Sequence, residues 1–72
     1  MSETSKRFGR WVYTYDESDN LVYIGFNPDV YASTDKTDWE IEKLTYDESG
    51  NLTGRYGPLD GSVDGQALLD WE

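Results

Sequence analysis

An internal repeat constrains the fold of this chain more than any other feature. Residues 13–21, YTYDESDNL, align with residues 44–52, LTYDESGNL, at a constant offset of 31, and the two segments match at seven of nine positions. In each copy a compact set of turn-forming residues separates two runs rich in apolar and aromatic side chains. The repeat therefore predicts two related β-hairpins in series, in a small antiparallel meander or sandwich where Tyr15 and Tyr46 occupy equivalent places.

The repeated turn residues have a physical reason to recur. Asp16 and Asp47 can accept hydrogen bonds from backbone N–H groups at the start of a type I turn. The residue that closes such a loop lies in the left-handed region, which Gly favours and Asp tolerates, and Asp19 and Gly50 stand at that position. Six residues are predicted to define the two turns: Asp16, Asp19, Asn20, Asp47, Gly50 and Asn51.

Apolar, β-branched and aromatic residues between the turn signals predict the extent of each strand. Four strands are expected, over residues 7–15, 21–26, 39–46 and 52–56. In the third strand Trp39 and Ile41 alternate, and the apolar phase then shifts at Leu44 and Tyr46. A bulge would produce this shift, and so would a sheet with both faces buried. The final segment, residues 66–71, is too short for periodicity to distinguish a strand from one helical turn.

The 72-residue length allows one small domain. Residues 1–6 are polar and without periodicity, which indicates a flexible N-terminal arm, and residues 7–72 are expected to form a single β domain. Within the first internal loop, the isolated apolar residues Val30 and Tyr31 are expected to fix the loop to the body. The domain divides into a hairpin (7–26), a loop (27–38), a second hairpin (39–56), and a loop with the last element (57–72).

The missing residue types exclude much chemistry. The chain has no Cys and no His, so disulfides, ordinary zinc centres and catalysis by His or Cys are excluded. A sheet of this size offers little concavity for a substrate, so we expect neither an enzyme nor a bound cofactor. No apolar run approaches a membrane span or a signal peptide, and a net charge of −9 argues against nucleic acid as a ligand. We expect the chain to start at Met1 and to work in the cytosol or within an assembly.

The acidic turns also invite a comparison with calcium sites. Their Asp, Ser and Asn side chains present oxygen atoms at alternate positions, over residues 16–20 and 47–51. An EF-hand loop needs about twelve residues, with Gly at the sixth position and a bidentate Glu at the twelfth, and neither turn has them. Turn stabilisation explains these residues better than metal binding, and no metal is expected.

The aromatic residues, eleven in all, are too many for one small core face. In the first strand Trp11, Tyr13 and Tyr15 lie on one side. Such side chains either lie flat across an exposed sheet with their hydroxyls in water, or form a face that binds another protein. The candidate interface residues are Trp11, Tyr13, Tyr23, Trp39 and Trp71, and residues 2–10 are a candidate docking arm.

Several short motifs resemble those of a group of small tailed-bacteriophage proteins. Tyr23-Ile24-Gly25 closes an aromatic hairpin, and Asp38-Trp39-Glu40-Ile41 follows a Thr-rich loop. Residues 43–51 then read Lys-x-Thr-Tyr-Asp-x-x-Gly-Asn. The last two motifs are Gly57-Pro58-Leu59 and Leu69-Asp70-Trp71. The resemblance thus covers most of the chain.

The chain differs from the phage group in its last loop, and one of its segments also resembles a second group of proteins. Members of the phage group commonly carry Trp and Arg in the last loop, where this chain has Val63 and Gln66. Residues 45–53 also resemble the Tyr-Asp repeats of large bacterial surface and toxin-shell proteins, which recur at a closer spacing than the offset of 31 found here.

The resemblance to the phage group implies a virion-associated protein that lacks an established catalytic role. We expect a non-enzymatic structural or adaptor component of a tailed phage particle, at the capsid surface, neck or tail. It would bind other phage structural proteins through aromatic faces and strand edges, in multiple copies set by particle symmetry, after synthesis in the host bacterial cytoplasm. Neither nucleic acid nor a membrane is expected as a partner.

The alternative is an acidic phage-encoded inhibitor that imitates DNA and acts on a host protein. A mimic should line its carboxylates along one face, whereas a structural module needs acids only in its turns. Many acids of this chain lie in the repeated turns, yet Glu40 and Glu42 share one face of a strand. The placement favours the structural interpretation and leaves the inhibitor second.

Overall fold

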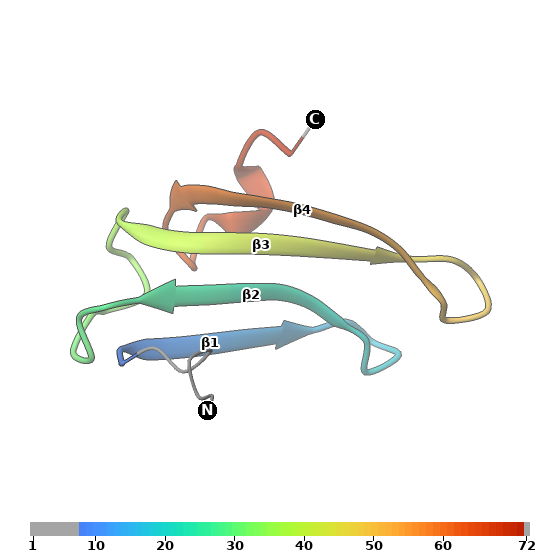
Figure 1. The fold of residues 1–72 in the computed structure, drawn as a ribbon, viewed down its shortest axis with the longest axis horizontal. Coiled ribbons are helices and arrows are strands. Elements are labelled where there is room, and N and C mark those ends of the chain that lie inside the picture. Colours follow the sequence, from blue (N-terminus) through green and yellow to red (C-terminus); the bar gives the residue numbers. More distant parts are fainter. Residues whose placement is uncertain (1–7, 72) are drawn as a thin grey trace, which may run out of the picture.

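The structure, a computed structural model, describes residues 8–71 of the chain. Its strands form one four-stranded antiparallel sheet in the order β1-β2-β3-β4, so each strand pairs with the next along the chain (Figure 1). The all-β prediction is confirmed, in its meander form. The elements are β1 (Arg10–Tyr15), β2 (Leu21–Asn27), β3 (Trp39–Tyr46), β4 (Leu52–Gly61) and a short 3₁₀ turn, η1 (Gln66–Leu68).

The N-terminal predictions fall mostly outside the described part of the chain. The expected arm, residues 1–6, lies there, as does most of the candidate docking arm. Within the described residues β1 begins at Arg10, and Phe8 and Gly9 precede it outside the strand.

The sheet has two faces of different character. Val12, Gly25, Ile41 and Leu59 lie opposite one another across the four strands, and the neighbouring row is Trp11, Phe26, Glu40 and Asp60. Successive side chains of a strand point to opposite faces. The Val12 row therefore belongs to one face, which we call the inner face, and the Trp11 row belongs to the outer face.

The core lies on the inner face. Trp39 and Ile41 have no exposed surface, and Ala32 packs against them. Val63 fits over Gly25, where an added Cβ atom would lie 3.3 Å from a Val63 methyl carbon and 3.4 Å from the Trp39 ring. The covering segments are the loop 28–38 and the C-terminal segment 62–71, and η1 lies behind the sheet in Figure 1.

Hydrogen bonds hold the C-terminal segment in place. Trp71 Nε1 donates to the carbonyl of Gln66 at 2.8 Å, and Gln66 Nε2 donates to Thr14 Oγ1 on β1 at 2.9 Å. The backbone N–H of Asp64 also donates to the carbonyl of Thr34 at 3.0 Å. The sequence left open a strand or a helical turn in this segment, and the structure has a 3₁₀ turn over Gln66–Leu68.

The fourth strand is longer than predicted. It was expected to end at Tyr56, but it continues to Gly61 through Gly57 and Pro58. Ile41 lies opposite Leu59 and Lys43 lies opposite Tyr56, so β4 contains one extra residue between those pairs. Pro58 is compatible with pairing because β4 is an edge strand, where a missing N–H can face away from the ladder.

The phase shift in the third strand reflects a sheet with apolar groups on both faces. Trp39 and Ile41 point to the inner face, while Leu44, which is also buried, points to the outer face. The bulge associated with this region lies in the partner strand β4. Because β3 keeps its own alternation, burial on both faces explains the shift, and the bulge explanation is wrong for the third strand.

The loop 28–38 is fixed differently from the prediction. Val30 and Tyr31 were expected to anchor it, but their side chains are 51% and 90% exposed. The small side chain of Ala32 fits against the core instead, where Tyr31 would need far more space. Trp39 Nε1 donates to the carbonyl of Ser33 at 2.9 Å, and Arg10 Nη1 donates to the carbonyl of Ala32 at 2.7 Å.

Candidate functional site

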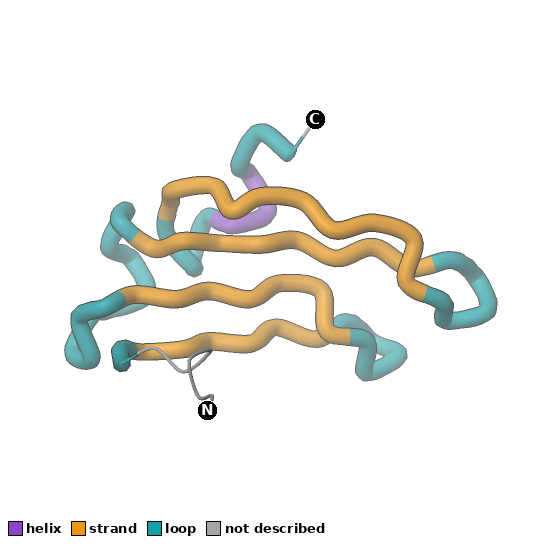
Figure 2. The backbone as a smooth tube through the Cα atoms, in the orientation of Figure 1, coloured by secondary structure: helices purple, strands orange, loops and turns teal. Residues whose placement is uncertain are grey.

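The repeated turns have nearly identical hydrogen bonds. Asp16 Oδ1 accepts from the backbone N–H groups of Ser18 and Asn20 at 2.8 and 2.9 Å, and Asp47 Oδ1 accepts from the equivalent N–H groups of Ser49 and Asn51, both at 2.9 Å. Both turns lie at the same end of the sheet, opposite the loop 28–38 (Figure 2). The left-handed residue is Asp19, with φ 65°, in the first turn and Gly50, with φ 85°, in the second. The repeat in sequence is thus a repeat in structure.

The turn carboxylates are held in their charged form. The hydrogen bond from the Asn20 backbone N–H lowers the pKa of Asp16 below its ordinary value, and the Asn51 N–H does the same to the pKa of Asp47. The carboxylate oxygens of Asp16 and Asp47 thus serve as acceptors of hydrogen bonds within the turns. Within residues 8–71, no group of three or more acidic side chains is placed to hold a metal ion.

A polar cleft separates the two turns. The pairing of β2 with β3 ends at Tyr23 and Lys43, so the hairpins diverge beyond that point. The hydroxyl of Tyr46 donates to the carbonyl of Leu21 at 2.7 Å and joins the two hairpins within the diverging region. The cleft has a volume of about 780 Å³. Its lining combines strand residues with turn residues that already bond to one another, such as Asp16 and Asn20.

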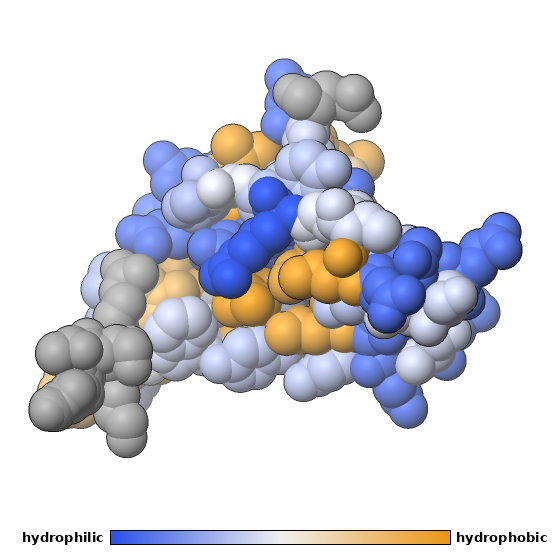
Figure 3. Space-filling model, turned by 45° about the vertical axis from the view of Figure 1, so that its right-hand side comes forward, coloured by the Kyte–Doolittle hydropathy of each residue, from blue (hydrophilic) through white to orange (hydrophobic). Residues whose placement is uncertain are grey.

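The outer face carries an aromatic cluster on β1 and β2. The rings of Trp11 and Tyr13 stack, with centroids 6.3 Å apart and an angle of 5° between their planes. The centroids of the Trp11 and Phe26 rings are 4.5 Å apart. Phe26 is buried beneath this cluster, whereas Trp11, Tyr13 and Tyr15 are 39%, 50% and 57% exposed. Figure 3 shows hydrophobic side chains across the middle of the molecule and hydrophilic side chains at the turn end. Within residues 8–71 both covering segments lie on the inner face, and Trp11 and Tyr13 stay partly exposed on the outer face.

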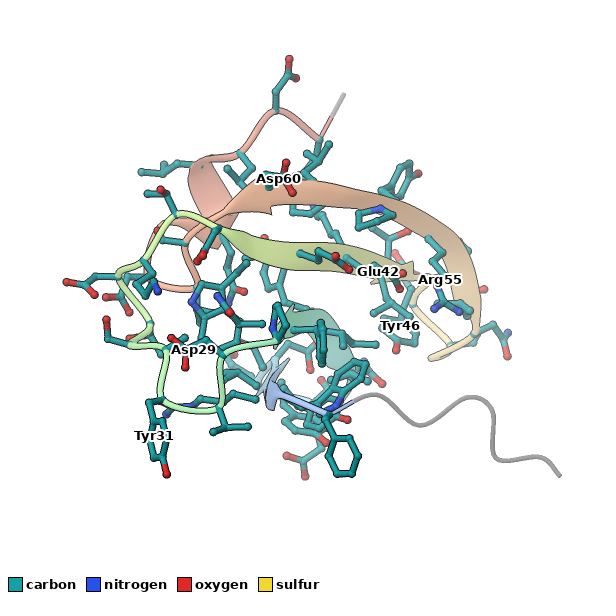
Figure 4. The ribbon with its side chains drawn as sticks, turned by 60° about the vertical axis from the view of Figure 1, so that its left-hand side comes forward. Asp29, Tyr31, Glu42, Tyr46, Arg55 and Asp60 are labelled. Carbon is teal, nitrogen blue, oxygen red and sulfur yellow. The ribbon has the colours of Figure 1, made fainter. Side chains whose placement is uncertain are left out.

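Beside the aromatic cluster, the outer face becomes charged. Glu40, Glu42 and Asp60 lie on this face of β3 and β4, together with Arg55. Arg55 Nη2 and Nε lie 2.7 and 2.9 Å from Glu42 Oε1, and Figure 4 shows the two side chains next to each other. Because Arg55 is largely exposed, this ion pair contributes little to stability, at most about 1 kcal/mol.

A small depression lies where the aromatic and charged regions meet. It has a volume of about 140 Å³, which is room for part of one side chain. Its lining includes Trp11, Ile24 and Phe26 from the aromatic side, and Glu42 and Arg55 from the charged side. An apolar group with a polar or basic tip would match both walls.

The five candidate interface residues fall on different faces. Trp11 and Tyr13 lie together on the outer face, whereas Tyr23 and Trp71 pack on the inner face with ring centroids 6.0 Å apart. Trp39 is fully buried, so its side chain cannot touch a partner in this conformation.

The outer face contains residues beyond the candidate interface residues. Tyr15, Phe26 and Arg55 belong to this face as well. Alternation along β1 predicts that Tyr15 lies on the same face as Trp11 and Tyr13. The positions of Phe26 and Arg55 on this face depend on the register between strands, which the sequence does not show. The outer face is therefore assembled from residues of several strands.

Comparison with known proteins adds no relative. No family model matches the chain, and no significant match is found among the curated proteins or the solved structures. No helix in the described residues has the length and apolar character needed to cross a membrane.

Proposed function

We propose that this protein is a non-enzymatic structural or adaptor component that binds another protein through its outer face. The observation that carries the proposal is the partly exposed aromatic pair Trp11 and Tyr13, which lies over the buried Phe26 beside a small depression. Trp and Tyr dominate binding energy at protein interfaces, especially where a central pocket receives a partner side chain. The acidic groups next to the cluster favour a partner with basic residues around an apolar anchor.

Partner binding would also supply stability that a small chain lacks. A domain of this size buries only about 60% of the surface that its unfolded chain exposes. Trp11, Tyr13 and Tyr15 retain much of their apolar area in water. Covering that area on a partner would add to the burial that the inner core provides.

The assembly that we propose is a tailed phage particle, with the protein at the capsid surface, neck or tail. The support is the resemblance of residues 23–25, 38–41 and 43–51 to small phage proteins. The partners would be other phage structural proteins, and the particle symmetry would set the copy number. The chain would be made in the host bacterial cytoplasm and function in the virion.

Quantitative mass spectrometry of purified particles tests this proposal. The wild-type protein should be present in a fixed ratio to the known structural proteins, and Trp11→Ala should lower its incorporation by more than about tenfold. Tyr31→Ala is the matched control, because Tyr31 is 90% exposed on the loop 28–38 and lies off the outer face. Absence of the wild-type protein from particles, or equal incorporation of both variants, would contradict the proposal.

A second candidate, an acidic inhibitor that imitates DNA, has one observation in its favour. Glu40, Glu42 and Asp60 share the outer face. Arg55 opposes it, because its guanidinium pairs with Glu42 and interrupts the row of negative charge. This candidate predicts that Arg55→Gln strengthens competition with DNA for a host protein. Stoichiometric presence in particles would exclude a purely intracellular inhibitor.

A further inference from the structure

The junction between the two hairpins provides a template for contacts between copies. An offset of 31 relates β1 to β3 and β2 to β4 through the repeated turns. Inside the chain, β2 of the first hairpin pairs with β3 of the second, from Tyr23 opposite Lys43 to Phe26 opposite Glu40. The two hairpins thus join through the edges of β2 and β3. The outer edges of the described sheet are β1 and β4.

We propose that a second copy of this chain docks head to tail, with β4 of one copy pairing with β1 of the next as β2 pairs with β3. Adding 31 to a β2 residue gives its equivalent on β4, and subtracting 31 from a β3 residue gives its equivalent on β1. The register of β2 with β3 therefore predicts the register of β4 of one copy with β1 of the next. The expected pairs are Gly54 with Val12, Arg55 with Trp11, Tyr56 with Arg10, and Gly57 with Gly9. The copies would then form one continuous antiparallel sheet.

The side-chain hydrogen bond from Tyr46 between the hairpins has an equivalent at the proposed junction. Inside the chain, the hydroxyl of Tyr46 donates to the carbonyl of Leu21. The repeat equivalents are Tyr15 and Leu52, which lie on the two edge strands. Their side chains are 57% and 55% exposed. The Tyr15 hydroxyl of one copy is therefore expected to donate to the Leu52 carbonyl of the next.

The edge segments that would pair, residues 9–12 and 54–57, contain no proline, and their charged residues are Arg10 and Arg55. Natural sheets protect their edges with charged residues, prolines and bulges. Residues 11–15, WVYTY, contain no charge and no proline. On β4 the proline is Pro58, which follows the last proposed pair at Gly57. The proposed register thus leaves Pro58 unpaired and reaches the β4 bulge only at its last pair, Gly57 with Gly9.

The proposed register also places compatible side chains together. Arg55 and Trp11 would face each other on the outer face, where a guanidinium can stack on an indole ring. Arg55 can do so while it keeps its ion pair with Glu42, because the ring contacts the plane of the guanidinium and not its edge. Gly54 would lie opposite Val12 on the inner side, where the Tyr56 ring and Thr45 Oγ1 already occupy the space beside Gly54.

Charge sets the conditions under which this contact forms. Each copy carries a net charge of −9, so copies repel one another at low ionic strength. Added salt screens that repulsion, since the Debye length falls from about 30 Å at 0.01 M to about 8 Å at 0.15 M. A head-to-tail contact of this kind closes into a ring or continues as a filament. The inference rests on the strand edges and does not depend on the proposed function of the outer face.

Sedimentation of the purified protein at increasing concentration and salt tests the association. The wild-type weight-average mass should rise with concentration, and more strongly at high salt. Tyr15→Phe should weaken association about fivefold through the loss of one hydrogen bond. Tyr46→Phe is the matched control, since it removes the internal equivalent and should leave association unchanged. A wild-type protein that stays monomeric under all conditions, or equal association of wild type and Tyr15→Phe, would overturn the proposal.

Disulfide trapping tests the register independently, because the chain contains no other cysteine. A mixture of Trp11→Cys and Arg55→Cys proteins should form the mixed disulfide, since directly opposite residues place their Cβ atoms at about 4.5–5.5 Å. A mixture of Tyr13→Cys and Arg55→Cys should form it at least about fivefold less. Comparable trapping of the Tyr13→Cys mixture, or of Arg55→Cys with itself, would show another mode of pairing and overturn the register.

Discussion

The hydroxyl of Tyr46 on β3 lies 2.7 Å from the backbone carbonyl of Leu21 on β2. This bond joins the hairpins beyond the last backbone pair of the two strands, Tyr23 with Lys43. It therefore limits how far the two turns separate. The equivalent tyrosine of the first hairpin, Tyr15, lies on the edge strand β1.

Tyr46→Phe is expected to lower the free energy of unfolding by about 1 kcal/mol, because it removes one partly buried hydrogen bond and no apolar contact. Tyr15→Phe should leave the free energy of unfolding of the monomer unchanged. Urea unfolding at low protein concentration and low salt measures both values. Equal destabilisation by the two variants would show that the Tyr46 bond has no special role.

Gly50→Val is expected to lower the free energy of unfolding by about 1 to 2 kcal/mol. Gly50 has φ 85°, and an added Cβ atom would meet nothing within 4 Å, so the backbone conformation alone carries the effect. The first turn supplies the control, because Asp19 occupies the same position with φ 65°. Asp19→Gly should raise the free energy of unfolding by about 0.5 kcal/mol. Urea unfolding would contradict this account if Gly50→Val were neutral.

Acid is expected to weaken the two turns. Hydrogen bonds from backbone N–H groups, first of all those of Asn20 and Asn51, lower the pKa of Asp16 and Asp47 from the ordinary value of 3.8. Between the lower folded pKa and the unfolded one, the unfolded chain binds more protons. The stabilisation is therefore fully present above the unfolded pKa, and it is lost as the pH falls through the folded pKa.

Urea unfolding from about pH 6 to about pH 2.5 measures this loss. Protonation of other carboxylates also relieves the repulsion among the charges that make up the net −9, so the wild-type curve alone mixes two effects. Asp16→Asn and Asp47→Asn isolate the turn effect. Each variant should flatten the acid-side slope, and by a similar amount because the two turns share their geometry. A slope unchanged in both variants would contradict the assignment.

Local chemistry explains why the hairpins could be predicted from the sequence. The turn signals of residues 16–20 and 47–51 act within a few residues, and they fix where the flanking strands stop and start. The predicted end of the third strand at Tyr46 and the predicted start of the fourth at Leu52 match the structure for this reason. Such information needs no knowledge of the rest of the fold.

Strand order explains why the end of β4 could not be predicted. Gly57 and Pro58 would interrupt a central strand, but β4 lies at an edge and continues to Gly61. The sequence of the segment does not show whether its strand is central or at an edge. The same limit applies to Ala32, whose burial depends on where the loop meets Trp39.

The division of aromatics between the faces has a similar cause. Alternation places Trp11 with Tyr13, and Trp39 with Ile41, but it does not say which set is covered. The C-terminal segment decides this, because Val63, Leu69 and Trp71 pack over the inner face. The candidate site could be predicted as a set of aromatics, and its actual members follow from this covering segment.

Trp71→Ala is expected to lower the free energy of unfolding by about 2 kcal/mol, since Trp71 is half-buried against Tyr23 and its ring nitrogen bonds to the Gln66 carbonyl. Leu68→Ala in the same segment is the control, because Leu68 is 90% exposed and its loss should change stability by less than about 0.5 kcal/mol. Urea unfolding followed by far-UV circular dichroism measures both variants. If Trp71→Ala left the free energy of unfolding unchanged, the C-terminal segment would cover the inner face without stabilising the sheet. Trp71 would then again be a candidate for partner binding.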